Sequence, residues 1–279
     1  YRKKLFLLTY MDNKNSILLI DPLFEPANAA ECYLLIKIGL KSFSYAIINA
    51  KTKKIAAVFN EQECENSVKT LEKRLKNDNY LTLPYQDVKI ALHTANAISI
   101  PQAIFDEENL SANTTYFPEN YTDNLYVDVQ NHFGFNTIFS LPKNTESILD
   151  FDNGKFFLEN AGLLNQAEQL NGPSLILDFA VGSVNAIYLD QNQVIFQQNY
   201  EIDDVEEFNY YLLLMINQLN MEKNTIVYIC GIVHENDANY NCLHKYFSSI
   251  EFLTVDNDMS ISKRMRIFVR EFCVPTFCF

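Results

Sequence analysis

The sequence predicts an α/β protein built from two similar units, with an α+β subdomain inserted between them. Three observations support this fold class. A set of three apolar segments joined by short polar turns occurs twice, each set is followed by a segment with helical spacing, and a stretch of different pattern separates the two sets. The chain has 279 residues, of which 48% are hydrophobic and 13% aromatic, so it can bury one large core or two ordinary ones.

The first set begins with three strands in close succession. Apolar runs at 33–38, 43–49 and 54–59 are separated by polar turns, which predicts an antiparallel meander. Apolar residues at helical spacing then predict a helix over 61–76, and a further strand is expected at 88–93.

The second set repeats this order. Its elements are expected at the following residues: strands at 174–179, 184–190 and 194–200, a helix at 203–220, a strand at 225–230, a helix at 239–247 and a strand at 250–255. Asp203 or Asp204 caps the first of these helices, and Glu206 and Glu207 lie near its positive end.

A shift of about 141 residues superposes the two meanders. Apolar positions then fall on apolar positions, and polar positions match as well: Lys37 falls on Asp178, and Ser44 falls on Asn185. Because almost no residues are identical, chance similarity remains an alternative to internal duplication. The shared order of strands and helix favours duplication.

Residues 97–169 interrupt the repeated pattern and indicate an inserted α+β subdomain. The elements expected inside it are strands at 125–129 and 135–141 and helices at 145–149 and 155–169. The turn signal Asn171-Gly172-Pro173 follows it. We therefore expect a first half at 1–170, which includes the insertion, and a second half at 171–279.

Charge and composition argue against several classes of function. The 35 acidic and 22 basic residues give a net charge of -13, so nucleic acid is not an expected partner. The six cysteines show no C-x-x-C spacing, which is typical of reduced thiols in a cytoplasmic protein. No apolar run reaches the roughly 18 to 20 residues of a membrane span, and the start is too weakly apolar for a signal peptide. Because the chain begins without Met, its natural N-terminus is expected to lie further upstream.

Glycine is scarce in this chain. It has 7 glycines, where an average usage of about 7% would give roughly 20. Phosphate loops of the P-loop or dinucleotide type need several glycines close together, because the backbone must approach the phosphates. No window supplies them, so both kinds of site are excluded.

The order of elements and several segments resemble known proteins. A meander followed by helix, strand, helix and strand, occurring twice, resembles the actin-like ATPase superfamily, whose halves are ribonuclease-H-like. Segments 100–108, 195–201, 208–214 and 227–231 are similar to an uncharacterised bacterial family, domain of unknown function 3822. The resemblance covers most of the chain from about residue 33. It implies a duplicated ribonuclease-H-like (actin-like ATPase) fold with no assigned activity.

The resemblance also implies where a nucleotide would bind. In actin-like ATPases the first phosphate loop carries an Asp that organises the metal and the attacking water, and Lys37 stands at that position, close to Gly39 and Ser42. A lysine has no acceptor for Mg²⁺ and has the wrong charge.

The other two loops are incomplete by the same comparison. The positions that match the family pattern are Asp178, Gly182 and Ser183 in the second phosphate loop and Gly231 in the adenosine loop. Ala180 and Val181 replace glycines of the second loop, and Ile232 replaces a glycine of the third. The region of the expected general base, residues 93–96, contains no carboxylate.

These departures predict a catalytically degenerate protein that acts as a binding or assembly scaffold for a protein partner, with no catalytic residue or metal site assigned. The alternative that remains open is an ATP-binding protein or slow Mg-dependent ATPase, which would use a cleft between the halves and bind ATP and Mg²⁺ through the matching positions.

Other candidate sites have simpler explanations. The residues His234, Cys242 and His244 fit no zinc pattern. The acidic run at 203–207 is explained by the start of a helix better than by a bound cation. The last expected helix, 260–272, has one apolar face and four basic residues. We expect it to dock on a sheet, and peripheral contact with anionic lipid is the alternative.

Overall fold

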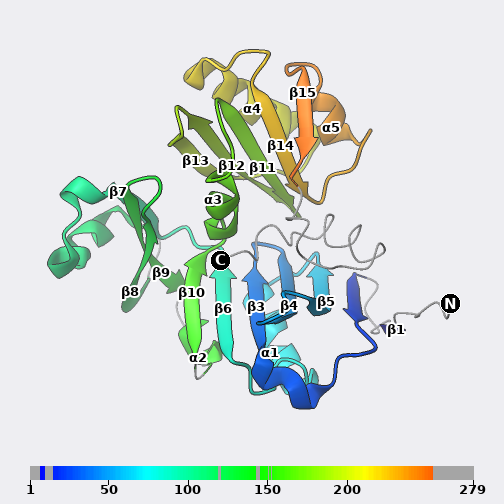
Figure 1. Cartoon of the computed structure of the whole chain (residues 1–279). Coiled ribbons are helices and arrows are strands. Elements are labelled where there is room, and N and C mark those ends of the chain that lie inside the picture. The colour runs from blue at the N-terminus through cyan, green and yellow to red at the C-terminus, as the bar shows by residue number, and fades with distance from the viewer. Residues whose placement is uncertain are drawn as a thin grey trace. The chain divides into compact units, whose positions relative to one another are not determined.

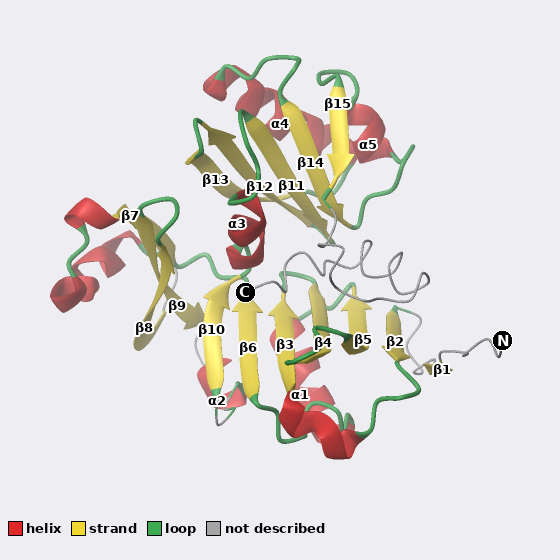
Figure 2. Cartoon of the chain, viewed as in Figure 1, coloured by secondary structure: helices red, strands yellow, loops and turns green. Residues whose placement is uncertain are grey.

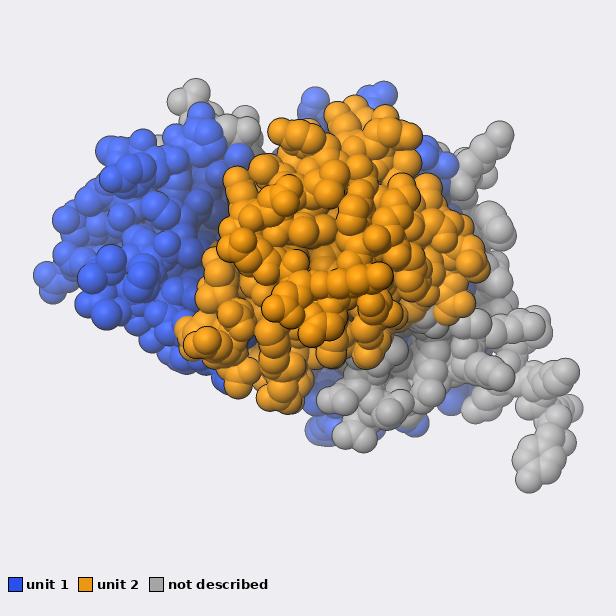
Figure 3. Space-filling view, turned by 90° about the horizontal axis from the view of Figure 1, so that it is seen from above, with its two compact units in different colours: residues 1–161 blue, residues 162–279 orange. Residues whose placement is uncertain are grey.

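The computed structural model describes residues 7–9, 15–118, 121–142, 145–149, 151 and 153–253. The chain divides into two compact units, residues 1–161 and 162–279, and each has its own sheet and hydrophobic core (Figures 1 and 3). Within the described part of the chain, no helix has the length and apolar character needed to cross a membrane. The helix expected at 260–272 lies outside the described residues.

The first unit is built on a seven-stranded sheet with the order β1-β2-β5-β4-β3-β6-β10 (Figure 2). Its strands are β1 (Leu7–Thr9), β2 (Ser16–Ile20), β3 (Cys32–Ile38), β4 (Ser42–Asn49), β5 (Ile55–Gln62), β6 (Asp87–Leu92) and β10 (Gly154–Leu158). A separate sheet with the order β7-β9-β8 contains β7 (Ala97–Pro101), β8 (Tyr121–Gln130) and β9 (Phe135–Pro142). The helices of this unit are η1 (Pro26–Glu31), α1 (Ser67–Asn77), η2 (Gln102–Ile104), η3 (Glu107–Tyr116) and α2 (Thr145–Ile148).

The meander β3-β4-β5 is confirmed, but the helix after it begins later than the expected residue 61. β5 continues to Gln62 because β2 pairs with it, and Glu61 lies opposite Ser16. The Glu61 carboxylate accepts hydrogen bonds of 2.8 and 2.6 Å from Arg74 of α1. The helix starts only at Ser67, where the Asn66 side chain caps it.

Residues 155–158, expected to be helical, form most of strand β10. This strand runs parallel to β6, with Gly154 opposite Val88 and Leu158 opposite Leu92. Its pairing partner β6 lies far away in sequence and leaves no local signal. The helical spacing of the residues after β10 therefore led to the prediction of a helix over the whole segment. The helix in this region is short and spans α3 (Ala161–Ala167).

The second unit carries a five-stranded sheet with the order β13-β12-β11-β14-β15. Its remaining elements after α3 are β11 (Ser174–Ala180), β12 (Ser183–Asp190), β13 (Gln193–Glu201), α4 (Val205–Leu219), β14 (Ile226–Gly231), α5 (Ala238–Leu243) and β15 (Ser249–Phe252). Asp204 is the N-cap of α4 and accepts a 2.9 Å bond from the Glu207 amide, while the Glu207 side chain accepts a bond from the Asp203 amide. The Glu207 side chain thus bonds the amide one residue before the N-cap, which is a variant of the capping box.

The two sheets share one order of strands and one register. The order β5-β4-β3-β6-β10 in the first unit corresponds to β13-β12-β11-β14-β15 in the second. In the first hairpin Lys37 lies opposite Ser44, and in the second Asp178 lies opposite Asn185. The shift of about 141 residues therefore aligns the two hairpins pair by pair.

Candidate functional site

Lys37 lies near the carboxyl end of β3, where its side chain is only 4% exposed. Its Nζ atom is 3.7 Å from Oε1 of Glu159, and Oε2 of Glu159 is 3.2 Å from Nδ1 of His93. His93 directly follows β6, and Glu159 directly follows β10, so the three residues meet where three neighbouring parallel strands end. A buried ammonium group needs a counter-charge, and Glu159 supplies it.

Sequence reasoning missed the carboxylate of this cluster. Residues 93–96 contain no acidic side chain, and Glu159 lies 66 residues beyond His93. Only the pairing of β6 with β10 brings the two residues together. The signal that could have found Glu159 is its place directly after an apolar run, at the carboxyl end of a strand.

Gly39 and Ser42 form the turn that joins β3 to β4. The Gly39 amide donates a 2.9 Å hydrogen bond to the Ser42 carbonyl. A Cβ atom on Gly39 would lie 2.5 Å from Ser42 Oγ and 3.2 Å from Glu159 Oε1. The absence of a side chain at position 39 is therefore explained by the close approach of this turn to the ion pair.

Asp178 and Gly231 lie side by side in the second unit. Asp178 is fully buried, and its Oδ1 accepts a 3.5 Å hydrogen bond from the Cys230 thiol. Gly231 has a φ of +82°, and a Cβ atom there would overlap the Phe179 carbonyl oxygen and press on Asp178 Oδ1. Close packing of β14 against β11 therefore requires glycine at position 231.

Gly182 and Ser183 form the end of the turn between β11 and β12. Gly182 has a φ of +72°, which the short turn requires. The Ser183 hydroxyl is shielded from solvent, and no hydrogen-bond partner for it is found among the described residues. The turn therefore accounts for Gly182, and Ser183 is the first residue of β12.

The residues at these loops do not fit a magnesium nucleotide. Mg²⁺ prefers oxygen ligands, whereas the first loop presents the Lys37 ammonium, and the second has one carboxylate, Asp178, which is buried and bonded to a thiol. Across the described residues, no three His, Cys, Asp or Glu side chains are grouped to hold a metal ion. The residues His234, Cys242 and His244 are among those that form no such group.

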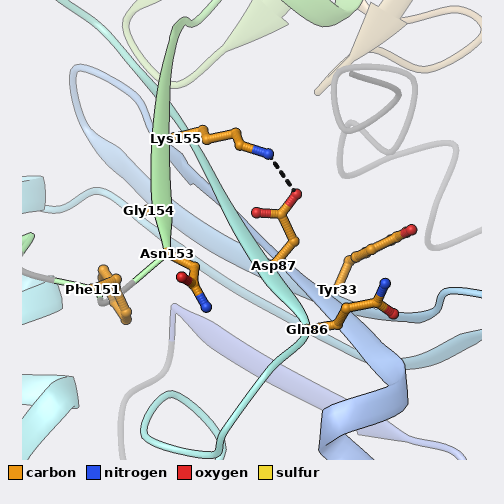
Figure 4. A pocket seen from close by; sticks show the side chains of 7 residues that line it. All are labelled: Tyr33, Gln86, Asp87, Phe151, Asn153, Gly154 and Lys155. Atoms are coloured by element: carbon orange, nitrogen blue, oxygen red, sulfur yellow. Dashed lines mark hydrogen bonds and ion pairs between the residues drawn. The ribbon is translucent and has the colours of Figure 1, made fainter.

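A separate hollow of about 530 Å³ lies at the opposite end of the first sheet (Figure 4). Its lining residues are Tyr33, Gln86, Asp87, Phe151, Asn153, Gly154 and Lys155. Lys155 Nζ reaches Asp87 Oδ2 at 3.1 Å, so the two charges lining it are paired (Figure 4). Ligands of parallel α/β sheets bind at the carboxyl ends of strands, and this hollow is at their amino ends.

The two units have the same strand order. In each, a meander is followed by a helix, a strand, a connection that contains a helix, and a parallel strand. This arrangement defines a protein of the actin-like ATPase fold. A protein with actin-like ATPase fold and unknown function from Bacteroides thetaiotaomicron superposes with a TM-score of 0.71 at 17% identity, over 83% of this chain and 94% of that chain. The chain belongs to the family described as "Protein of unknown function (DUF3822)", which matches residues 21–250.

Other solved structures share the fold at lower identity. The PilM-PilN type IV pilus biogenesis complex matches with a TM-score of 0.60 and 13% identity, over 89% of this chain and 98% of that chain. The ethanolamine utilization protein EutJ from Carboxydothermus hydrogenoformans matches with a TM-score of 0.50 and 6% identity, over 92% of each chain. No curated protein matches the sequence.

Proposed function

We propose that this chain is a catalytically degenerate member of the actin-like fold, and that it works as a scaffold that binds a partner protein. The observation that carries the proposal is the ion pair between Lys37 and Glu159. This buried ammonium group supports the proposal because the resemblance to actin-like ATPases aligns Lys37 with the acid that organises the metal in those proteins.

The chemistry of phosphoryl transfer explains why this substitution matters. Catalysis of that reaction depends on holding the phosphates and on neutralising their developing charge with a metal ion. Lys37 reverses the charge needed to hold the metal, and Glu159, the carboxylate beside it, is already committed to Lys37 and His93. The retained glycines are accounted for by turn geometry and strand packing, so they do not argue for a phosphate cradle.

A binding role is supported by what this fold does elsewhere. PilM, whose structure matches at a TM-score of 0.60, was solved as a complex with PilN in type IV pilus biogenesis. We extend to this chain only the capacity of the fold to hold another protein. The net charge of -13 favours a partner with basic segments.

Calorimetry and phosphate release test the proposal directly. The full chain is titrated with ATP and with ADP in the presence of Mg²⁺, and thermal unfolding is followed with the same ligands. We expect no saturable heat, no shift of the melting temperature and no turnover. A Mg-dependent ATPase rate that disappears in the isosteric variant Asp178→Asn would overturn the proposal, and that matched control separates it from a contaminating enzyme.

A further inference from the structure

β13 is the outermost strand of the sheet in the second unit (Figure 2). It is nine residues long, and no strand of the described residues pairs with its outer side. Natural proteins protect such edges with lysine, proline or short strands. β13 contains no Lys, Arg or Pro, and residues 194–200 carry no charge. Among the strands that the structure describes, none occupies this edge, and its composition allows pairing with a further strand.

In the first unit, the strand that corresponds to β13 already pairs with an additional strand on its outer side. β5 is the counterpart of β13, because Asn60 of β5 lies opposite Ser44 as Asn199 of β13 lies opposite Asn185. The outer side of β5 carries β2, which runs antiparallel to it. Almost every residue of β5 is buried as a result, whereas β13 keeps exposed residues along its whole length. The same fold in the same chain thus accepts an antiparallel strand at the equivalent edge.

Exposed apolar and aromatic side chains lie on β13 and on helix α4, which contacts it. Ile195 on β13 is 55% exposed, and Tyr210 on α4 is 63% exposed. The rings of Tyr200 and Tyr211 stack with centroids 4.4 Å apart, and Tyr210 lies against Tyr211 at 5.4 Å. In the first unit, the β2 side chain Leu18 is buried in the core at the equivalent edge. Side chains of an added strand at β13 would find aromatic surface to cover.

Charge decides which kind of strand this edge fits. Residues 162–253 contain twelve acidic and only two basic side chains. Exposed acidic residues lie at the end of β13 and directly after it, namely Glu201, Asp203, Asp204, Glu206 and Glu207. A second copy of the chain carries the same excess of acidic side chains, and this like charge disfavours pairing of β13 with itself. A basic strand is attracted instead.

We propose that the outer edge of β13 accepts an extended basic segment of a partner protein as an added antiparallel strand. Main-chain hydrogen bonds supply the pairing, as in other cases of strand addition. In the antiparallel orientation the amino end of the added strand lies beside Glu201 and Asp203, so its basic residues precede its alternating apolar residues. This inference rests on the proposed scaffold function and specifies the partner.

A peptide probe tests the proposal with the full chain. The probe is a synthetic peptide with a run of lysines followed by alternating valine and threonine. We expect chemical-shift changes in a ¹⁵N-labelled chain to concentrate on the amides of β13. The variant Asp203→Lys/Glu206→Lys is expected to weaken binding by roughly tenfold, and added salt is expected to weaken it as well.

Matched controls separate strand addition from general attraction to an acidic surface. The variant Glu235→Lys/Glu251→Lys makes the same charge change away from β13 and is expected to leave binding unchanged. A probe N-methylated on the amides that face β13 is expected to lose binding, whereas methylation of the alternate amides is expected to be tolerated.

Three outcomes would overturn the proposal: no shift changes up to the solubility limit of the probe, changes located elsewhere, or equal loss in both charge variants. A dimer that depends on β13 in sedimentation velocity would overturn it too. Nucleotide calorimetry does not depend on β13. If the probe does not bind and nucleotide does not bind either, the strand-addition proposal is refuted and the scaffold function still stands. If the probe binds at β13 but the chain shows Mg-dependent turnover, the proposal of a degenerate scaffold is refuted and the binding edge at β13 still stands.

Discussion

Removing the negative charge of Glu159 is the sharpest perturbation of the candidate site. The variant Glu159→Gln keeps the shape of the side chain and a polar group beside His93, but it removes the negative charge that lies 3.7 Å from the Lys37 ammonium. At 3.7 Å and an effective dielectric constant near 20, Coulomb's law gives about 4.5 kcal/mol for the lost attraction. Breaking one partner of a buried ion pair typically costs about 3 to 5 kcal/mol.

Urea unfolding followed by circular dichroism measures this cost. We expect Glu159→Gln to lower the free energy of unfolding of the first unit by about 3 to 5 kcal/mol. The double variant Lys37→Met/Glu159→Gln is expected to recover most of the loss, because it removes the stranded charge as well.

Two results would refute this reasoning. One is a loss below about 1 kcal/mol in Glu159→Gln, which is the level of an exposed ion pair. The other is a double variant as unstable as Glu159→Gln, since the cost would then not come from the Lys37 charge.

Three further predictions concern stability. Gly231→Ala is expected to lower the free energy of unfolding by more than about 2 kcal/mol, because a Cβ atom would overlap the Phe179 carbonyl; Gly134→Ala, where φ is also positive but no atom is near, should cost less. Asp204→Ala removes the α4 cap and should cost about 1 kcal/mol by urea unfolding. Burial raises the pKa of Asp128 to about 6, so its contribution to stability is present below about pH 4 and is lost as the pH rises to 6. Asp128→Asn should remove that slope from the melting temperature.

Each of these predictions has a contrary result. Equal losses in the two glycine variants would show that overlap at Gly231 is relieved by backbone movement. A wild-type free energy of unfolding in Asp204→Ala would mean that the capping bond contributes nothing to stability. An unchanged pH profile in Asp128→Asn would assign the slope between pH 4 and 6 to other carboxylates.

The sequence predicted the elements whose determinants are local. Alternating apolar runs and short turns located both meanders, and Asp204 was one of two expected caps of α4. The start of α1 was wrong because Glu61 resembles an early helical residue by itself. Its strand conformation follows from pairing with β2 and from Arg74, and neither contact is encoded nearby.

The candidate site shows the same division. Lys37 could be selected from the sequence because its hairpin aligns with that of Asp178, and a lysine at that position is chemically conspicuous. Glu159 and His93 could not be joined to it, because their proximity depends on β6 and β10 being neighbours. Parallel pairing across a long insertion leaves no pattern at any short spacing.

The place of Glu159 in the chain bears on how the protein folds. Lys37 is made early, but its counter-charge arrives only after the whole three-stranded insertion has been synthesised. We expect the first sheet to stay open at β6 until β10 emerges and carries Glu159 into place. The second sheet uses strands that follow one another without such an excursion, and contacts of shorter sequence separation form faster. During refolding, the carboxyl-terminal sheet should therefore acquire protection from hydrogen exchange before the β6–β10 ladder does.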